Sequence, residues 1–209
     1  MFDVDGTLVK SFQFDEACYV AAVKEVLGHQ IDENWENYKY VTDSGLLLEH
    51  LQRHNIEENY LEIHNSVKES FMSNIKEHLL SHEIEEIPGA SNFIEYLLTN
   101  SSNSISIATG GWLETAKLKL YSAGIDVSSI PIASSNDHYS RTEIMKRALR
   151  KANQVSSNPV IYFGDAIWDK AACSELGYEF VLVGNKIQNE LSINDFMDIG
   201  YVESLLTPQ

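Results

Sequence analysis

From Gly89 onward, segments with a helical spacing of apolar residues alternate with short, mainly apolar runs. The predicted strands are 104–109, 130–133, 160–163 and 180–183, and the predicted helices are 93–98, 113–123, 144–152 and 171–176. Short strands separated by helices are typical of a parallel sheet, because parallel neighbours need a crossover connection. This part of the chain is therefore predicted to be α/β, with a Rossmann-like parallel sheet.

The segment 14–86 has a different pattern, with helical stripes and no convincing strand. Its longest stripe is Tyr60, Ile63, Val67, Phe71, Ile75 and Leu79, spaced three and four residues apart. A first strand is expected at residues 1–5. We therefore predict a core domain of residues 1–13 and 87–209, into which an all-helical domain of residues 14–86, called the cap below, is inserted.

Charge restricts the partners that this chain can bind. Its 209 residues carry a formal net charge of −16, so its surface repels phosphate backbones and anionic lipids at long range. Neither nucleic acid nor a membrane is an expected partner. Much of the excess acid lies in the cap and is interpreted as solvated helix faces rather than an acidic partner-binding surface.

Two cysteines, Cys18 and Cys173, are too few for a disulfide scaffold and are interpreted as reduced, buried and structural. The acidic start of the sequence does not resemble a secretion signal, and no run approaches the length of a membrane span. A cytoplasmic protein, monomeric or a small homo-oligomer, is the expectation.

The chemistry is concentrated first in Asp3-Val4-Asp5-Gly6-Thr7-Leu8. Carboxylates two residues apart on an extended backbone point the same way and repel each other unless a cation lies between them. Such a pair suits Mg²⁺, and one carboxylate can attack a phosphoryl group while the other shuttles a proton. The alternative is an Asp-Gly turn with an incidental second acid.

Three further polar features follow predicted strands, with the residues Thr109, Gly110, Arg141, Asp165 and Asp169. Each has an ordinary structural reading as a strand-to-helix turn, a surface arginine or a helix N-cap. Together with Asp3 they favour a site, because open α/β sheets bind ligands at the carboxyl ends of their strands. A hydroxyl, glycine amides and an arginine can hold phosphate oxygens there.

The order of these motifs resembles the haloacid dehalogenase superfamily, in particular its phosphatase and phosphomutase branch. The resemblance rests on Asp-x-Asp-Gly-Thr at the start, Thr-Gly-Gly in the middle, a basic residue, and Gly-Asp-x-x-x-Asp, and it covers nearly the whole chain. The inserted helices are similar to the helical cap of that family. Because a halide leaving group needs no proton, Asp5 indicates phosphate chemistry rather than dehalogenation.

The resemblance implies that Asp3 is the nucleophile and a Mg²⁺ ligand. It also implies that Asp5 is the general acid and base, with its backbone carbonyl on the metal. Asp165 would complete the metal site, while Asp169 would support it or hold Arg141 in place.

For the phosphate group, the resemblance implies binding by the hydroxyl of Thr109 and by the amides of Gly6 and Gly110. Arg141 stands where the family usually has lysine and would stabilise the nucleophile and the transferred phosphoryl group. Lys146, one turn further along, is the fallback cation. A second departure is that only two residues precede Asp3, so either the first strand is short or the true start lies upstream.

These expectations define a Mg²⁺-dependent phosphohydrolase that acts on a small phosphorylated metabolite through an aspartyl phosphate. Two alternatives remain open: a phosphomutase of the β-phosphoglucomutase type, and a catalytically silent binding protein on the same fold.

Other candidates are weaker. The pairs His50 with His54 and His78 with His82 have zinc-ligand spacing but are expected to be exposed helix residues. Trp112 and Trp168 are expected in the core or at the rim of the site. Tyr38, Tyr40 and the turn at Asp43 are the cap positions expected near a substrate.

Overall fold

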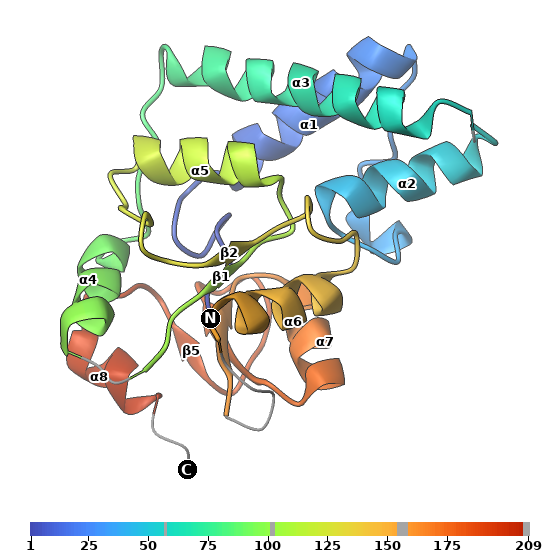
Figure 1. Ribbon diagram of the computed structural model, residues 1–209. Helices are drawn as coiled ribbons and strands as arrows, with labels where there is room; N and C mark the ends of the chain where they lie inside the picture. The colour runs from blue at the N-terminus through green and yellow to red at the C-terminus, as the bar shows by residue number, and fades with distance from the viewer. Residues whose placement is uncertain (57, 101–102, 154–158, 207–209) are drawn as a thin grey trace.

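The computed structural model describes residues 1–56, 58–100, 103–153 and 159–206. Its parallel strands lie beside the helices of the core, and a layer of helices from the cap covers one end (Figure 1). The predicted fold class is confirmed: a Rossmann-like α/β core carries an inserted all-helical cap.

The strands form a parallel arrangement around the segment at Phe2. On one side β1 (Ile107–Ala108) pairs with β2 (Ile132–Ala133). On the other side β3 (Ile161–Gly164) pairs with β4 (Glu179–Val183), which pairs with β5 (Ser192–Ile193). Phe2 forms parallel bridges to both Ile107 and Phe163, so it joins the two groups.

The predicted first strand at residues 1–5 is wrong in extent, because only Phe2 bridges to β1 and β3, while the bridge of Asp5 is to Val9 in the turn that follows. The chain turns directly after Asp3: the amides of Thr7 and Leu8 donate to the carbonyl oxygen of Val4. Of the other predicted strands, β1 and β2 are shorter than predicted, whereas β3 and β4 agree with the prediction to within one residue at each end. Strand β5 was not predicted, because no apolar run marks it in the sequence.

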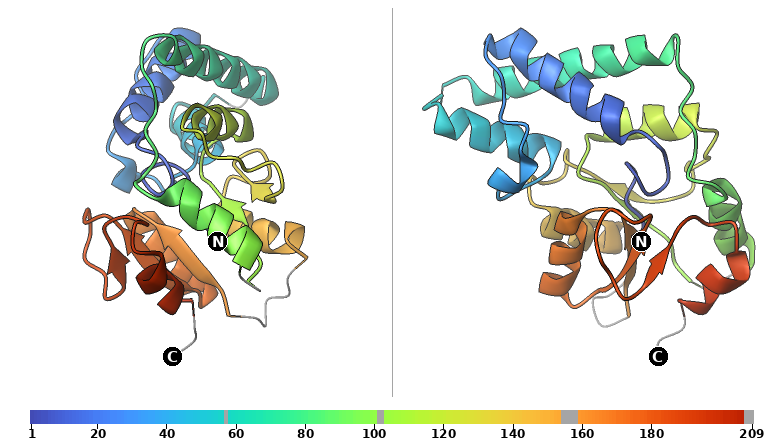
Figure 2. Two further views of the ribbon diagram at one scale, coloured as in Figure 1. Left: turned by 90° about the vertical axis from the view of Figure 1, so that its left-hand side faces the viewer. Right: turned by 180° about the vertical axis from the view of Figure 1, so that it is seen from behind.

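The four predicted core helices are present in the predicted order, and a further helix at 199–204 was not predicted. The core helices are α4 (Ala90–Asn100), α5 (Leu113–Ser122), α6 (Arg141–Lys151), α7 (Ile167–Leu176) and α8 (Ile199–Ser204). The cap contains α1 (Phe12–Leu27), the 3₁₀ turn η1 (Trp35–Asn37), α2 (Asp43–Arg53) and α3 (Tyr60–Leu79). Helix α1 packs on α3, and α3 also contacts α5 of the core; both views of Figure 2 show this stack.

Buried apolar clusters stabilise both the core and the cap. In the core, the rings of Phe2, Phe93, Phe163 and Phe196 pack against each other at centroid distances of 5.0–6.2 Å. In the cap, Tyr19, Leu47, Val67 and Phe71 are buried around Trp112, which follows β1. Trp112 therefore belongs to the apolar interior, and it ties the cap to the core.

The cap is connected to the core by two neighbouring chain segments. Val9 and Glu86 form an antiparallel bridge, the amide of Lys10 donates to Glu85, and the amide of Ile87 donates to Leu8. We propose that this pairing marks the boundaries between a core of residues 1–13 and 87–209 and a cap of residues 14–86.

Cys18 and Cys173 are free thiols, as predicted, although only Cys173 is buried and Cys18 is half-buried. Among the described residues, no helix combines the length and the apolar composition needed to cross a membrane.

Candidate active site

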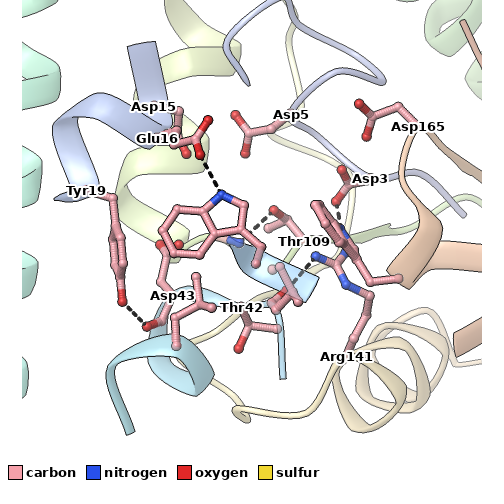
Figure 3. A pocket seen from close by; sticks show the side chains of 16 residues that line it. Asp3, Asp5, Asp15, Glu16, Tyr19, Thr42, Asp43, Thr109, Arg141 and Asp165 are labelled. Carbon is pink, nitrogen blue, oxygen red and sulfur yellow. Dashed lines mark hydrogen bonds and ion pairs between the residues drawn. The ribbon is translucent and has the colours of Figure 1, made fainter. Parts of the chain in front are cut away.

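A cavity of about 90 Å³ lies between the cap and the carboxyl ends of the strands. The core contributes Asp3, Asp5, Thr109, Gly110, Gly111, Arg141, Asp165 and Trp168, and the cap contributes Asp15, Glu16, Tyr19, Trp35, Val41, Thr42, Asp43 and Leu46. Figure 3 shows Asp3, Asp165 and Arg141 on one side of this cavity and Asp15, Glu16, Tyr19 and Asp43 on the other. The cavity therefore brings together residues from positions 3 to 168.

Asp3 lies directly after the central segment, and its side chain is only 8% exposed. Its backbone amide donates to the carbonyl oxygen of Phe163 at 2.9 Å, which fixes the residue against β3. Burial raises the pKa of Asp3 well above its usual value, and the nearby carboxylate of Asp169 adds to this while Arg141 opposes it. A buried carboxylate in this setting requires positive charge nearby.

Arg141 begins α6 and supplies part of that charge. Its Nη1 atom lies 2.7 Å from Oδ1 of Asp169 and 3.6 Å from Oδ1 of Asp3, and its Nη2 atom donates to the carbonyl oxygen of Val41 at 3.0 Å. Asp169 also accepts a hydrogen bond from the hydroxyl of Tyr162 at 3.3 Å. The expected contact between Asp169 and Arg141 is present, and the guanidinium is held beside Asp3.

The fallback cation, Lys146, does not reach the cavity. It pairs with Glu143 at 2.7 Å on the outer face of α6, with its side chain 44% exposed. Of these two residues, Arg141 is the one that lies beside Asp3.

The donor set around Asp3 fits a divalent cation. Carboxylate oxygens of Asp3, Asp165 and Asp169 lie within 4.8 Å of one another, and all three residues are buried. Burial raises the pKa of Asp165 to about 6, although Lys186 donates a hydrogen bond to this carboxylate. Since Asp169 is occupied by Arg141, Asp3 and Asp165 are the side chains best placed to bind Mg²⁺.

Asp5 has two partners that the sequence did not reveal. Its Oδ1 atom accepts hydrogen bonds from the Nζ atom of Lys119 at 2.5 Å and from the hydroxyl of Ser11. Lys119 is fully buried on α5 and also pairs with Asp15 of cap helix α1 at 2.5 Å. Asp5, Lys119 and Asp15 thus form a buried carboxylate–ammonium–carboxylate triad that spans core and cap.

A sequence signal for Lys119 did exist. It lies three residues after Ala116, inside the apolar stripe that predicts the helix over 113–123, where a charged residue is out of place. A lysine at a buried helix position implies a buried acidic partner.

The glycines of the first two motifs make close approaches possible. Gly6 has φ of 79°, and a Cβ atom there would collide with the carboxylate of Asp165. A Cβ atom on Gly110 would collide with the guanidinium of Arg141. The amide of Gly6 donates to the carbonyl oxygen of Val9 at 2.8 Å, so it is not free to bind phosphate as expected. Gly6 instead provides space for the carboxylate of Asp165.

Thr109 is buried at the end of β1, and its Oγ1 atom accepts a hydrogen bond from the amide of Gly111 at 3.1 Å. This bond leaves the hydroxyl proton of Thr109 able to donate to an anion. Next to it, the amide of Asp43 donates to the carbonyl oxygen of Gly110 at 2.9 Å.

On the cap side, acidic and aromatic residues face the cavity. Oδ2 of Asp43 accepts from the amide of Trp112 at 2.7 Å, and the hydroxyl of Tyr19 donates to the carbonyl oxygen of Asp43 at 2.7 Å. Glu16 accepts from Nε1 of Trp35 at 2.7 Å. Asp43 therefore lies where it was expected, whereas Tyr38 and Tyr40 are not among the residues that line the cavity.

The histidine pairs are only partly as expected. His54 and His82 are exposed as expected, whereas His78 is half-buried and His50 is buried, with 2% of its surface exposed. The rings of His78 and His82 stack with their centroids 4.4 Å apart. His50 contacts His29 and His54 instead of solvent.

Solved structures share this fold over nearly the whole chain. A hydrolase from Pseudomonas syringae superposes with a TM-score of 0.76 at 21% identity, covering 99% of this chain and 98% of that one. CbbY from Rhodobacter sphaeroides, in complex with phosphate, has a TM-score of 0.72 at 19% identity, with 95% and 94% covered. β-Phosphoglucomutase from Clostridium difficile has a TM-score of 0.71 at 19% identity, with 97% and 94% covered.

Fold and motifs together thus define an α/β hydrolytic enzyme with a helical cap. The sequence model of the haloacid dehalogenase-like hydrolases matches residues 1–183, and the chain belongs to this family. No curated protein matches it significantly.

Proposed function

We propose that the protein is a Mg²⁺-dependent phosphatase that acts on a small phosphorylated metabolite through an aspartyl phosphate on Asp3. One observation carries the proposal: a buried Asp3 lies in the cavity beside Arg141, with the carboxylates of Asp5 and Asp165 also lining it. This set contains a nucleophile, a proton carrier, a cation-binding pair and a fixed positive charge.

In the first step, a carboxylate oxygen of Asp3 attacks phosphorus, and the bond between phosphorus and the ester oxygen breaks. Asp5, in its protonated form, donates a proton to the departing oxygen, so the alcohol leaves neutral. The guanidinium of Arg141 and the hydroxyl of Thr109 stabilise charge on the phosphoryl oxygens.

In the second step, Asp5 removes a proton from water, which attacks the phosphorus of the aspartyl phosphate. Inorganic phosphate is released and Asp3 is regenerated. Lys119 positions the Asp5 carboxylate, because Lys119 is fully buried and fixed between Asp5 and Asp15.

Asp3 and Asp165 would hold Mg²⁺ through side-chain oxygens, and Asp5 through its backbone carbonyl. Bound there, Mg²⁺ would neutralise phosphate charge. The raised pKa values of Asp3 and Asp165 support this assignment, because both carboxyls are buried with less positive charge than they need.

The charges that line the cavity also restrict the charge of the leaving group. Among the described residues that line it, Arg141 is the sole cation, while the cap side presents Asp15, Glu16 and Asp43. An anionic leaving group would be repelled there. We therefore propose a small alcohol that is neutral or positively charged, such as an amino alcohol.

The substrate class can be tested with a panel that pairs ethanolamine phosphate with phosphoglycolate, which differ chiefly in the charge of the leaving group. We expect kcat/KM to be at least about tenfold higher for ethanolamine phosphate, because like-charge contacts cost several kcal/mol. Equal rates, or a preference for phosphoglycolate, would contradict the proposed role of the cap carboxylates.

The activity itself is tested by phosphate release from p-nitrophenyl phosphate or acetyl phosphate with and without Mg²⁺. The expected result is metal-dependent turnover that disappears in Asp3→Asn. Turnover that is independent of Mg²⁺, or that survives in Asp3→Asn, would refute the mechanism.

A phosphomutase remains the second candidate, since the fold is shared with β-phosphoglucomutase. A mutase would need a bisphosphate primer and would yield an isomerised sugar phosphate rather than inorganic phosphate. A protein without turnover that binds phosphate would instead be a silent binding protein.

A further inference from the structure

Three histidines from separate parts of the sequence meet at one end of the cap. His29 directly follows Gly28, which ends α1 in a left-handed conformation with φ of 75°. His50 lies in the last turn of α2, and His54 is the C-cap residue of the same helix. One ring nitrogen of each histidine lies within 4.8 Å of those of the other two.

We propose that His29, His50 and His54 bind one divalent transition-metal ion of the zinc class, with solvent in the remaining position. Tetrahedral zinc with Zn–N bonds of 2.0–2.1 Å places its nitrogen ligands about 3.3 Å apart. Nε2 of His50 and Nδ1 of His29 are already 3.1 Å apart. A nitrogen of the third ring, that of His54, lies within 4.8 Å of both.

The ring of His54 is held as a metal ligand would be. Its Nδ1 atom donates a hydrogen bond to the backbone oxygen of His50 at 2.9 Å, which leaves the Nε2 lone pair available. Metal-binding histidines commonly use their second nitrogen in this way, because the bond fixes both the tautomer and the ring orientation.

Two helix ends favour a cation at this position. The C-termini of α1 and α2, capped by Gly28 and His54, lie at the same end of the cap (Figures 1 and 2). Each helix C-terminus carries a partial negative charge, so the two together attract positive charge.

The nearby cation, Arg53, has acidic partners of its own. Arg53 lies over the ring of Tyr38 at 4.1 Å and forms ion pairs with Glu49 at 3.7 Å and Asp32 at 3.9 Å. These partners balance its charge.

A metal can reach the three histidines from outside. His54 is exposed, His29 is half-buried and His50 is buried, so the approach runs past His54. None of the three lines the cavity around Asp3, so this site is separate from the proposed phosphatase site. Bound metal would join α1, which carries Asp15, to α2, which carries Asp43.

The experiment is calorimetric titration of Zn²⁺ into protein without a histidine tag, in excess Mg²⁺ so that the carboxylate site is filled. We expect one equivalent of Zn²⁺ to bind. His54→Ala and His29→Ala should each weaken Zn²⁺ binding by about 100-fold. Removing a group that only supports a metal ligand already costs about 10–100-fold in affinity, and these variants remove a ligand itself.

The matched control is the double variant His78→Ala/His82→Ala. It removes a stacked histidine pair with the same spacing as His50 and His54. Among the described residues, no third metal-binding side chain lies close enough to complete a site with this pair. It should bind Zn²⁺ as the wild type does. Co²⁺ in place of Zn²⁺ should give the visible absorption bands of a tetrahedral site in the wild type and in this control only.

The proposal is overturned if the wild type binds no Zn²⁺, if His54→Ala binds it equally well, or if the control variant loses it to the same extent. His54→Gln, which keeps a polar side chain at the exposed end of α2, replaces the alanine variant should that one not fold. Because these measurements need no turnover, their outcome is independent of the phosphatase proposal.

Discussion

Lys119 is a buried cation that pairs with Asp5 of the core and with Asp15 of the cap. The variant Lys119→Met keeps an unbranched side chain of similar length but removes the ammonium group. Asp5 and Asp15, whose side chains are only 17% and 18% exposed, then face each other without a cation. Breaking a buried ion pair by removing one partner costs about 3–5 kcal/mol.

Partial exposure of the two carboxylates places the expected loss near the lower limit, about 3 kcal/mol. With a urea m-value of about 2–3 kcal/mol/M, the unfolding midpoint should fall by about 1–1.5 M. In the double variant Lys119→Met/Asp15→Asn, part of this loss should be recovered, because one of the two uncompensated charges is gone.

Turnover should fall more than substrate affinity in Lys119→Met, since Lys119 positions Asp5 and does not line the cavity. The assay is urea unfolding followed by circular dichroism, together with kcat and KM for p-nitrophenyl phosphate. Lys117→Met, on the exposed face of the same helix, is the matched control. A midpoint equal to that of the control would refute the buried triad.

Three further variants test single contacts. In urea unfolding, the stability of Asp15→Asn relative to the wild type should rise by about 1–3 kcal/mol between pH 4 and pH 7.5. Burial raises the pKa of Asp15 from 3.8 to about 6. Between these pH values the native state therefore binds more protons than the unfolded state, and wild-type stability falls as the pH rises. A difference between variant and wild type that grows toward low pH would contradict this reasoning. Gly6→Ala should abolish turnover and lower the free energy of unfolding by about 1–3 kcal/mol, because a φ of 79° is strained for alanine and the new Cβ atom would meet Asp165. Wild-type kinetics in this variant would show that no such contact exists. Arg141→Lys should lower kcat/KM about tenfold, because one ammonium cannot bond Asp169 and Val41 at once; unchanged kinetics would show that charge alone suffices.

The architecture of the core could be predicted from the sequence, because the spacing of apolar residues is a local property of each segment. Apolar stripes and short apolar runs determine which segments are helices or strands, and glycines mark where they end. The extent of pairing at residues 1–5 and the strand β5 depend on neighbours that are distant in the sequence, and no local pattern marks either of them.

The sequence by itself also determined the motif residues, Asp3 to Asp169, because the ends of parallel strands must meet at one edge of the sheet. Only the tertiary structure decided what the cap adds to them. Helix packing brings Lys119 to Asp5 and Asp15, more than 100 positions away, and brings His29 to His50 and His54, more than 20 positions away. Such contacts depend on which helix faces meet, and spacing within one helix does not encode that.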